Sequence, residues 1–405
     1  MTSGPLAHPG FRWLLAARTT SLLGNSIAPV ALAFAVLDLT GSVTDVGLVV
    51  AARSLANVLL LLFGGVIADR FPRQLVLVGS SLAAAATQAA VATLVLSGNA
   101  SIPALAALSA VNGAVAAVAF PAASALTPQT VPAGLLQPAN ALLRLGTSAT
   151  AILGATAGGV LVAAAGPGYG LAADAGTYAL AALLFSRIRL HGRAVPSATS
   201  GVLADLREGW AEFTSRRWTW VVVAQFTVVN AAFVGTAAVL GPVVADRTIG
   251  RAAYGLVLAA QTAGLVLGGL VALRWQPDRP LRVGVALTVL SALPAVALAQ
   301  TPTLPALLLA AVLAGFAIEQ FGVAWDVALQ QHVPPDRLAR VYSYDAVGSF
   351  VAIPVGQAAV GPLAGLNGLR PTLLGCAAAI CLATLAALSS SSVRDLRRAP
   401  AITPA

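Results

Sequence analysis

Lysine is absent from this chain of 405 residues, and charge of either sign is scarce. Only 9% of the residues are charged and 58% are hydrophobic, whereas about 25% of the residues in a typical soluble domain are charged. Because a water-facing surface needs more polar residues than this, the composition predicts an integral membrane protein. Without lysine there is also no Gly-Lys-Ser/Thr phosphate loop, which excludes ATP hydrolysis of that kind.

Histidine and cysteine are rare as well. His8, His191 and His332 lie far apart without the spacing of metal ligands, so we expect no metal site and no cofactor. Cys376 and Cys381 share one apolar run, where they are expected to pack as small hydrophobic residues. No reactive constellation is left, and we expect that the protein is not an enzyme.

Long apolar runs fill most of the chain. Charges and turn residues divide it into twelve runs, each about as long as the 20 residues that a membrane-spanning helix needs. None shows the alternating polarity of a barrel strand, so we predict an all-α membrane protein with twelve transmembrane helices. The approximate limits are 11–38, 45–69, 74–97, 102–127, 137–165, 168–189, 218–244, 251–274, 281–300, 303–330, 337–364 and 368–391.

The arginines that flank these runs predict an orientation. With the N-terminus in the cytoplasm, most of them lie on the cytoplasmic side, and only Arg247, Arg251 and Arg370 lie outside. The positive-inside rule then predicts a multi-pass protein of the cytoplasmic membrane with both termini in the cytoplasm. The net charge of +9 is explained by this topology and by anionic membrane lipids, so no nucleic-acid partner is expected.

The longest polar connection divides the runs into two groups of six. We predict an N-terminal six-helix bundle at 1–189 and a C-terminal six-helix bundle at 218–405, joined by a cytoplasmic linker at 190–217. The second half of this linker has the pattern of an amphipathic helix at the membrane surface.

Internal matches relate the two groups to each other. A shift of 202 positions superposes Gly154 on Gly356, together with several neighbouring matches. A shift of 204 positions superposes Gly65 on Gly269, at the end of the second run of each group. The repeated spacing indicates two pseudo-symmetric halves.

The stretch GGVIADRFPRQ, which joins the second and third runs, concentrates unusual residues. Gly65, Asp69, Arg70 and Arg73 resemble the signature between helices two and three of the major facilitator superfamily, although Pro72 replaces its second glycine. The order of six helices, a linker and six related helices is also the plan of that superfamily. The resemblance implies a transporter whose halves move about a substrate site near the middle of the membrane.

Charges at the cytoplasmic boundary are candidates for gating. Asp69 can accept hydrogen bonds from a helix N-terminus or pair with an arginine, and so latch the cytoplasmic side shut. Arg70 and Arg73 are either part of this gate or ordinary positive-inside anchors. Asp326 and Asp345, around the turn after the tenth run, are likewise gating or anchoring charges.

Longer stretches resemble one branch of the superfamily. Residues 30–42, 120–142 and 325–349 are similar to exporters of drugs, macrolides and siderophores. This resemblance implies export of a small amphipathic or hydrophobic compound by proton antiport, carried out by a monomer. The alternatives are an uptake or facilitative carrier of the same fold and, in another class, a membrane-embedded enzyme or receptor.

Small residues in the fifth and eleventh runs resemble a Gly-Pro-x-x-Gly-Gly motif of these exporters. They are Gly154, Gly158 and Gly159 in the fifth run and Gly361 and Pro362 in the eleventh. Glycines allow close helix packing, and the proline adds a kink. The pattern fits antiport, but it fits simple helix packing as well.

Polar residues inside apolar runs mark the candidate substrate site. In the superfamily, helices one, four, seven and ten line the cavity, and here they carry Asn25, Asn112, Asn230 and Glu319, with Gln320 beside the last. Polar groups are costly in hydrocarbon, so they usually face a cavity. Each asparagine could instead make a hydrogen bond between helices.

Charged side chains within the runs are fewer still. Glu319 is the candidate proton carrier, because it is expected near the centre of its run. Arg53 is expected to pair across helices or to attract an anionic substrate group, and Arg144 lies nearer the cytoplasmic end. Asp174 is expected near the outer boundary of the sixth run.

Overall fold

The computed structural model describes residues 4–70, 72–132, 135–188, 210–211, 213–272, 274–275, 277–300, 302–334, 341, 344–345 and 347–397. Over these residues every regular element is a helix. The helices are η1 (Pro5–Ala7), α1 (Pro9–Thr40), α2 (Val43–Arg70), α3 (Arg73–Leu96), α4 (Ile102–Leu126), η2 (Thr127–Gln129), α5 (Leu136–Ala165), α6 (Pro167–Ser186), α8 (Arg217–Gly235), η4 (Thr236–Leu240), α9 (Gly241–Arg247), α10 (Arg251–Ala272), α11 (Pro280–Leu287), η5 (Thr288–Ala292), α12 (Leu293–Ala299), α13 (Leu304–His332), α15 (Ala352–Asn367), α16 (Leu369–Ser389) and α17 (Ser391–Arg394).

Within this part of the chain, eleven segments are long and apolar enough to cross a membrane. The remaining predicted run is α6, which has 20 residues and a lower hydropathy because it carries Asp174 and several glycines. The predicted all-α fold class with twelve helices is confirmed. Backbone hydrogen bonds inside each helix are what allows such a chain to cross lipid.

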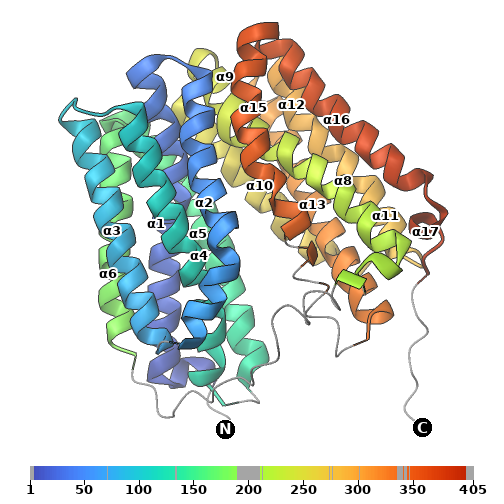
Figure 1. The fold of residues 1–405 in the computed structure, drawn as a ribbon, viewed down its shortest axis with the longest axis horizontal. Coiled ribbons are helices and arrows are strands. Elements are labelled where there is room, and N and C mark those ends of the chain that lie inside the picture. Colours follow the sequence, from blue (N-terminus) through green and yellow to red (C-terminus); the bar gives the residue numbers. More distant parts are fainter. Residues whose placement is uncertain are drawn as a thin grey trace. The chain divides into compact units, whose positions relative to one another are not determined.

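The helices form two compact units. The first contains the described residues of 1–197 and 241–259, and the second contains those of 198–240 and 260–405. In the first unit α1 packs against α5 and α6, α2 against α4, and α3 against α6 (Figure 1). In the second unit α8 packs against α15 and α16, and α11 packs against α13. The first unit thus contains α9 and the start of α10 besides the first six long helices.

Two glycine turns show the repetition in the backbone itself. Gly166 separates α5 from α6 with a φ of 93°, and Gly368 separates α15 from α16 with a φ of 88°. Such positive φ values favour glycine, which has no Cβ to clash. The two residues lie 202 positions apart, which is the offset that the sequence predicts for this part of the halves.

A second pair of glycines corrects the predicted sequence offset between α2 and α10, the corresponding helices of the two halves. A Cβ on Gly113 of α4 would overlap the backbone carbonyl of Arg53 on α2, and a Cβ on Gly315 of α13 would overlap that of Gln261 on α10. The two glycines lie 202 positions apart, whereas Arg53 and Gln261 lie 208 apart. The predicted offset of 204 for these helices is therefore wrong by about one helical turn. Both helices contain several glycines and alanines, and small residues coincide in either register.

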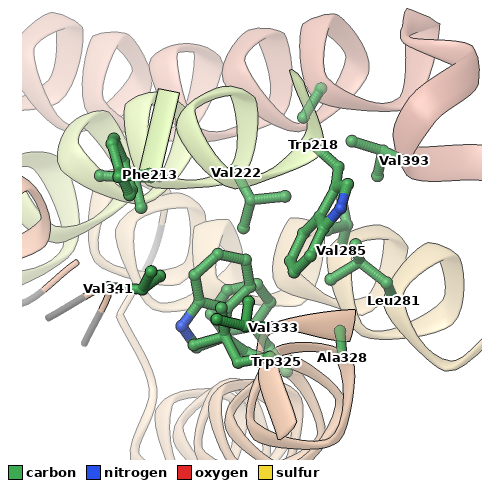
Figure 2. Packing of buried hydrophobic residues seen from close by; sticks show 14 residues of the cluster. Phe213, Trp218, Val222, Leu281, Val285, Trp325, Ala328, Val333, Val341 and Val393 are labelled. Atoms are coloured by element: carbon green, nitrogen blue, oxygen red, sulfur yellow. The ribbon is translucent and has the colours of Figure 1, made fainter. Parts of the chain in front are cut away.

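Aromatic residues build the core of the second unit. The rings of Trp218 on α8 and Trp325 on α13 meet edge to face with centroids 5.5 Å apart (Figure 2). Phe226, two turns after Trp218 on α8, stacks on Phe321, one turn before Trp325 on α13, with centroids 4.2 Å apart. Large buried rings contribute much of the packing energy in such a core. These contacts fix α8 against α13.

The predicted linker helix lies mostly outside the described residues. Its described end includes Trp210 and Phe213, whose rings both lie within 6.0 Å of the ring of Tyr344. Phe213 is buried, while Trp210 remains exposed. The end of the linker is therefore packed onto the second unit.

Candidate functional site

Arg53 is the centre of a polar network inside the first unit. Its Nη2 donates a hydrogen bond of 2.6 Å to Oδ1 of Asn25 on α1, and its Nε donates one of 3.2 Å to Oδ1 of Asn112 on α4. The side-chain nitrogen of Asn112 in turn donates to Oγ1 of Thr87 on α3 at 3.3 Å. Gly113 makes this possible, because its missing side chain lets α2 approach α4 closely. The network connects α1, α2, α3 and α4.

The charge of Arg53 is held by neutral groups. Among the described residues its hydrogen-bond partners are two amide oxygens, and no carboxylate lies within ion-pair distance of it. Arg53 is only half-buried, whereas Asn112 is 3% exposed. A guanidinium inside an apolar helix bundle is costly, and such groups usually serve a ligand or a second charge. The two asparagines predicted on helices one and four thus belong to one site.

Next to this network lies a buried carboxyl group whose neighbours the sequence did not predict. Asp174 was expected near the outer boundary of the sixth run, and its side chain is fully buried against α1 and α3. Its Oδ2 accepts a hydrogen bond from the side-chain nitrogen of Gln88, the residue that follows Thr87 on α3. The sequence gives the position of Asp174 along α6, but it does not show which neighbouring helices its carboxyl group faces.

The predicted polar residues of the second unit fall into separate contacts. Asn230 on α8 donates a hydrogen bond of 2.9 Å to the backbone carbonyl of Ser349, a few residues before α15. Gln320 on α13 donates one of 2.8 Å to the carbonyl of Gly268 on α10. Glu319 is half-buried, and a Cβ on Gly269 would lie 3.7 Å from its Oε1. The carboxyl of Glu319 therefore faces a glycine surface of α10.

The residues predicted to gate are described only in part. The backbone of Gly65, Asp69 and Arg70 belongs to α2, but the surroundings of Gly65 and the side chains of Asp69 and Arg70 lie outside what the structure describes. Arg73 begins α3 and is half-buried. The side chain of Arg144 also lies outside the described residues.

The two carboxylates after the tenth run differ in their surroundings. Asp326 is exposed on α13. Asp345 accepts hydrogen bonds from the indole nitrogen of Trp325 at 2.8 Å and from the hydroxyl of Ser349 at 3.0 Å. Asp345 is therefore hydrogen-bonded to two neighbouring side chains, and Asp326 is the more exposed of the two.

The predicted packing residues lie at close contacts. Gly154 and Gly158 on α5 face α1, where added Cβ atoms would lie 2.6 Å from the carbonyl of Leu23 and 3.1 Å from Cα of Ile27. A Cβ on Gly159 would lie 2.9 Å from Cα of Gly255.

The motif of the eleventh run has a different environment. On α15 Gly361 is buried, and Pro362 lies inside the helix with an exposed ring. A proline inside a helix removes one backbone hydrogen bond and favours a kink.

A fold that is helical throughout the described residues, with eleven segments long and apolar enough to cross a membrane and with polar side chains gathered inside the units, defines an integral membrane transporter of small molecules. Residues 14–357 match the profile of the Major Facilitator Superfamily. The match covers most of the chain, and the protein belongs to this superfamily. Membership points to a transporter rather than an enzyme.

Two curated relatives are similar over nearly their whole length. The multidrug efflux pump Tap of Mycolicibacterium fortuitum is 28% identical over 414 residues, which cover 95% of this chain and 96% of the relative. The protein of the same name from Mycobacterium tuberculosis is 25% identical over 399 residues, which cover 96% of this chain and 94% of the relative.

Solved structures share the fold at low identity. A bacterial homologue of the human lysosomal transporter Spinster, in an inward-facing and unoccupied conformation, has a TM-score of 0.78 and 16% identity, with 97% of this chain and 99% of that chain covered. The nucleoside transporter NupG has a TM-score of 0.75 and 14% identity, with 94% and 98% covered. At such identities the likeness concerns the fold alone.

Sequence reasoning missed several polar residues of the interior. Thr87 and Gln88 lie in the third run among small apolar residues. Their hydrogen-bond partners, Asn112 on α4 and Asp174 on α6, are known only from the structure. In the second unit, Gln225 on α8 donates to Oγ1 of Thr288 at 2.7 Å and to Oγ1 of Thr384 at 3.3 Å. A threonine hydroxyl can donate a hydrogen bond to a backbone carbonyl of its own helix, so a threonine within an apolar run does not by itself indicate a polar site.

Proposed function

We propose that this transporter exports a small amphipathic or hydrophobic compound across the cytoplasmic membrane, with proton entry driving the exchange. The similarity to multidrug efflux pumps over about the full length of the chain is the observation that carries this proposal. The polar groups of the first unit are few and lie among apolar helices, which suits a ligand that is recognised mainly by shape and apolar contact.

Glu319 is the proposed proton carrier of the second unit. Its side chain is half-buried within α13 and lies beside the glycines of α10. In alternating access, a carboxyl at such a place takes a proton from one side and releases it on the other. The neighbouring Gln320 holds α13 against α10 and so keeps the carboxyl in place.

The orientation and the gate complete the proposal. Both termini are proposed to lie in the cytoplasm, because this orientation puts most of the flanking arginines on the cytoplasmic side. Asp69 is proposed to latch the cytoplasmic end of the transporter, with Arg70 and Arg73 next to it. Exchanging Asp69 for Asn removes the charge while keeping the shape, and we expect slower export with no loss of folded protein.

Reconstituted vesicles test the direction and the coupling together. Purified protein in proteoliposomes is given ethidium as an amphipathic probe, and a pH gradient is imposed. We expect ethidium to move opposite to the protons, and we expect Glu319→Gln to reduce the gradient-driven rate about tenfold or more while ethidium exchange without a gradient continues. Asp278→Asn, at an exposed position between α10 and α11, is the matched control and should transport like the original protein.

Other outcomes would favour the alternatives. Movement of ethidium in the same direction as protons would indicate a symporter. Movement that ignores the pH gradient would indicate a facilitative carrier. Chemical conversion of the probe would indicate an enzyme.

A further inference from the structure

Asp174 of α6 is a fully buried acid with one oxygen that has no partner. Its Oδ2 accepts a hydrogen bond from Gln88, but among the described residues nothing donates to its Oδ1. That oxygen faces Gly24 of α1, where a Cβ would overlap both the carboxyl and the hydroxyl of Thr177. The missing side chain at Gly24 is what leaves room for the acid.

Such a setting suits a group that changes its charge. A carboxylate in apolar packing is costly when one of its oxygens makes no hydrogen bond, because nothing replaces the water that it has lost. A proton on that oxygen removes the net charge and most of this cost. The hydrogen bond from Gln88 reaches the other oxygen, so it can persist in both forms, although it is stronger to the carboxylate.

The Arg53 network surrounds this acid through neighbouring residues. Asn25, which accepts from Arg53, directly follows Gly24 on α1, and Thr87, which ends the network, directly precedes Gln88 on α3. The charge of Arg53 acts on Asp174 electrostatically, and Tyr178 is the other titratable neighbour. Gln88 from α3 and Gly24 from α1 are neutral, and on α5 Val162 faces α6 one turn away.

We propose that Asp174 is a second proton-carrying group of the transport cycle and that Arg53 is its counter-charge. The inference rests on the proton coupling proposed above. When Asp174 is protonated, the asparagines hold the guanidinium of Arg53. When the O–H bond breaks, the proton leaves to water on the side that is open, and the carboxylate that remains is balanced by Arg53. A proton from water on the other side then restores the acid, so the cycle consumes no other reactant.

The first test observes the proton itself. Infrared difference spectra of the purified protein, recorded over a pH series, should contain a carboxylic acid C=O band that disappears as the pH rises. This band should be missing in Asp174→Asn, which keeps the size of the side chain and its acceptor for Gln88. Identical acid bands in both proteins would overturn the proposal.

A second variant keeps the test valid if Asp174→Asn does not fold. Gln88→Leu removes the hydrogen bond and leaves the acid in place. Because a hydrogen bond to a carboxylate favours the charged form, its loss should shift the band to a higher midpoint pH. A midpoint that does not move would count against Asp174 as the source of the band.

Transport separates this inference from the proposed function. In proteoliposomes, Asp174→Asn should reduce the ethidium flux driven by a pH gradient about tenfold or more. Exchange of ethidium measured in the absence of a gradient should continue. If the original protein shows no coupling to protons, the proposed function fails and this inference fails with it. If the original protein is coupled and Asp174→Asn keeps the same pH dependence, only this inference fails, and Glu319 remains the carrier.

Discussion

Arg251, the first residue of α10, donates hydrogen bonds from its guanidinium to both carboxylate oxygens of Asp38 in the last turns of α1. The Nη1 bond measures 2.8 Å, and Nε of the same side chain donates to Asp246 at 2.7 Å. The guanidinium also lies over the ring of Phe34, 4.7 Å from its centroid. These contacts join α1 to α10 within the first unit, and no local sequence pattern relates residues 213 positions apart.

The first prediction concerns this ion pair. Asp38→Asn should lower the free energy of unfolding by about 1 kcal/mol or less, because both side chains are partly exposed and solvent screens them. Arg251→Lys should lose a similar amount, since an ammonium cannot make the same two-pronged contact. Thermal unfolding in detergent, at low and at high salt, measures both effects.

A matched control comes from the second unit. Arg279 contacts Asp395 through a single bond of 3.3 Å, and the side chain of Asp395 is 62% exposed. Asp395→Asn should leave the melting temperature unchanged. Equal decreases of the melting temperature in Asp38→Asn and Asp395→Asn would show that the two-pronged contact between Arg251 and Asp38 adds no stability.

The second prediction concerns Arg53. Arg53→Lys keeps the charge but cannot reach Asn25 and Asn112 at once from two nitrogens of a planar group. We expect folded protein with an ethidium flux reduced about tenfold or more. Transport by Arg53→Lys at the original rate would show that the charge alone is sufficient.

The control for Arg53 lies one turn away on the same helix. Asn57 donates a hydrogen bond of 3.1 Å to the backbone carbonyl of Gly113, which is a contact between α2 and α4. Asn57→Leu should cost about 0.6 kcal/mol of stability, as typical for a hydrogen bond inside a membrane protein, and should keep the transport rate.

The third prediction tests a close contact of α5 with α10. Gly159→Ala would place a Cβ 2.9 Å from Cα of Gly255, so one helix must move. We expect a lower melting temperature and slower transport. Gly176→Ala on α6 is the control, because an added Cβ there meets nothing within 4 Å. An unchanged Gly159→Ala protein would show that α5 and α10 have room to separate.

The fourth prediction concerns the buried polar triad of the second unit. Thr384→Val keeps the shape but removes a hydroxyl that lies 3.1 Å from Oγ1 of Thr288 and accepts from Gln225. Gln225 keeps its shorter bond to Thr288, so the loss of stability should be about 1 kcal/mol or less. Gln225→Leu leaves both threonines without this donor and should cost more, as judged from melting temperatures in one detergent.

The helical architecture could be predicted from the sequence, because its signal is a property of whole segments. Runs of about 20 apolar residues become helices in lipid whatever their neighbours are. The relation between Gly154 and Gly356 could also be predicted from spacing, and Gly166 and Gly368 repeat it in the backbone angles. The offset that relates α2 to α10 could not be predicted, because the glycines and alanines of the two helices coincide in more than one alignment.

The site was predictable only where polarity stands out within a run. Asn25, Asn112 and Arg53 are conspicuous in apolar surroundings, and the structure joins them. Asp174 was expected near the outer boundary, but its distance along the helix does not reveal that its side chain is buried or which neighbours it faces. That information comes from packing, here from the space left by Gly24.

The edge-to-face pair of Trp218 and Trp325 gives the protein an optical reporter of its own. These two indoles are buried, and Trp325 is hydrogen-bonded to Asp345, while the other four tryptophans of the chain are exposed. A quencher dissolved in the surrounding lipid or detergent should therefore quench the fluorescence of the four exposed tryptophans more than that of Trp218 and Trp325. Changes in the light that remains can then be followed during turnover without attaching any dye to the protein.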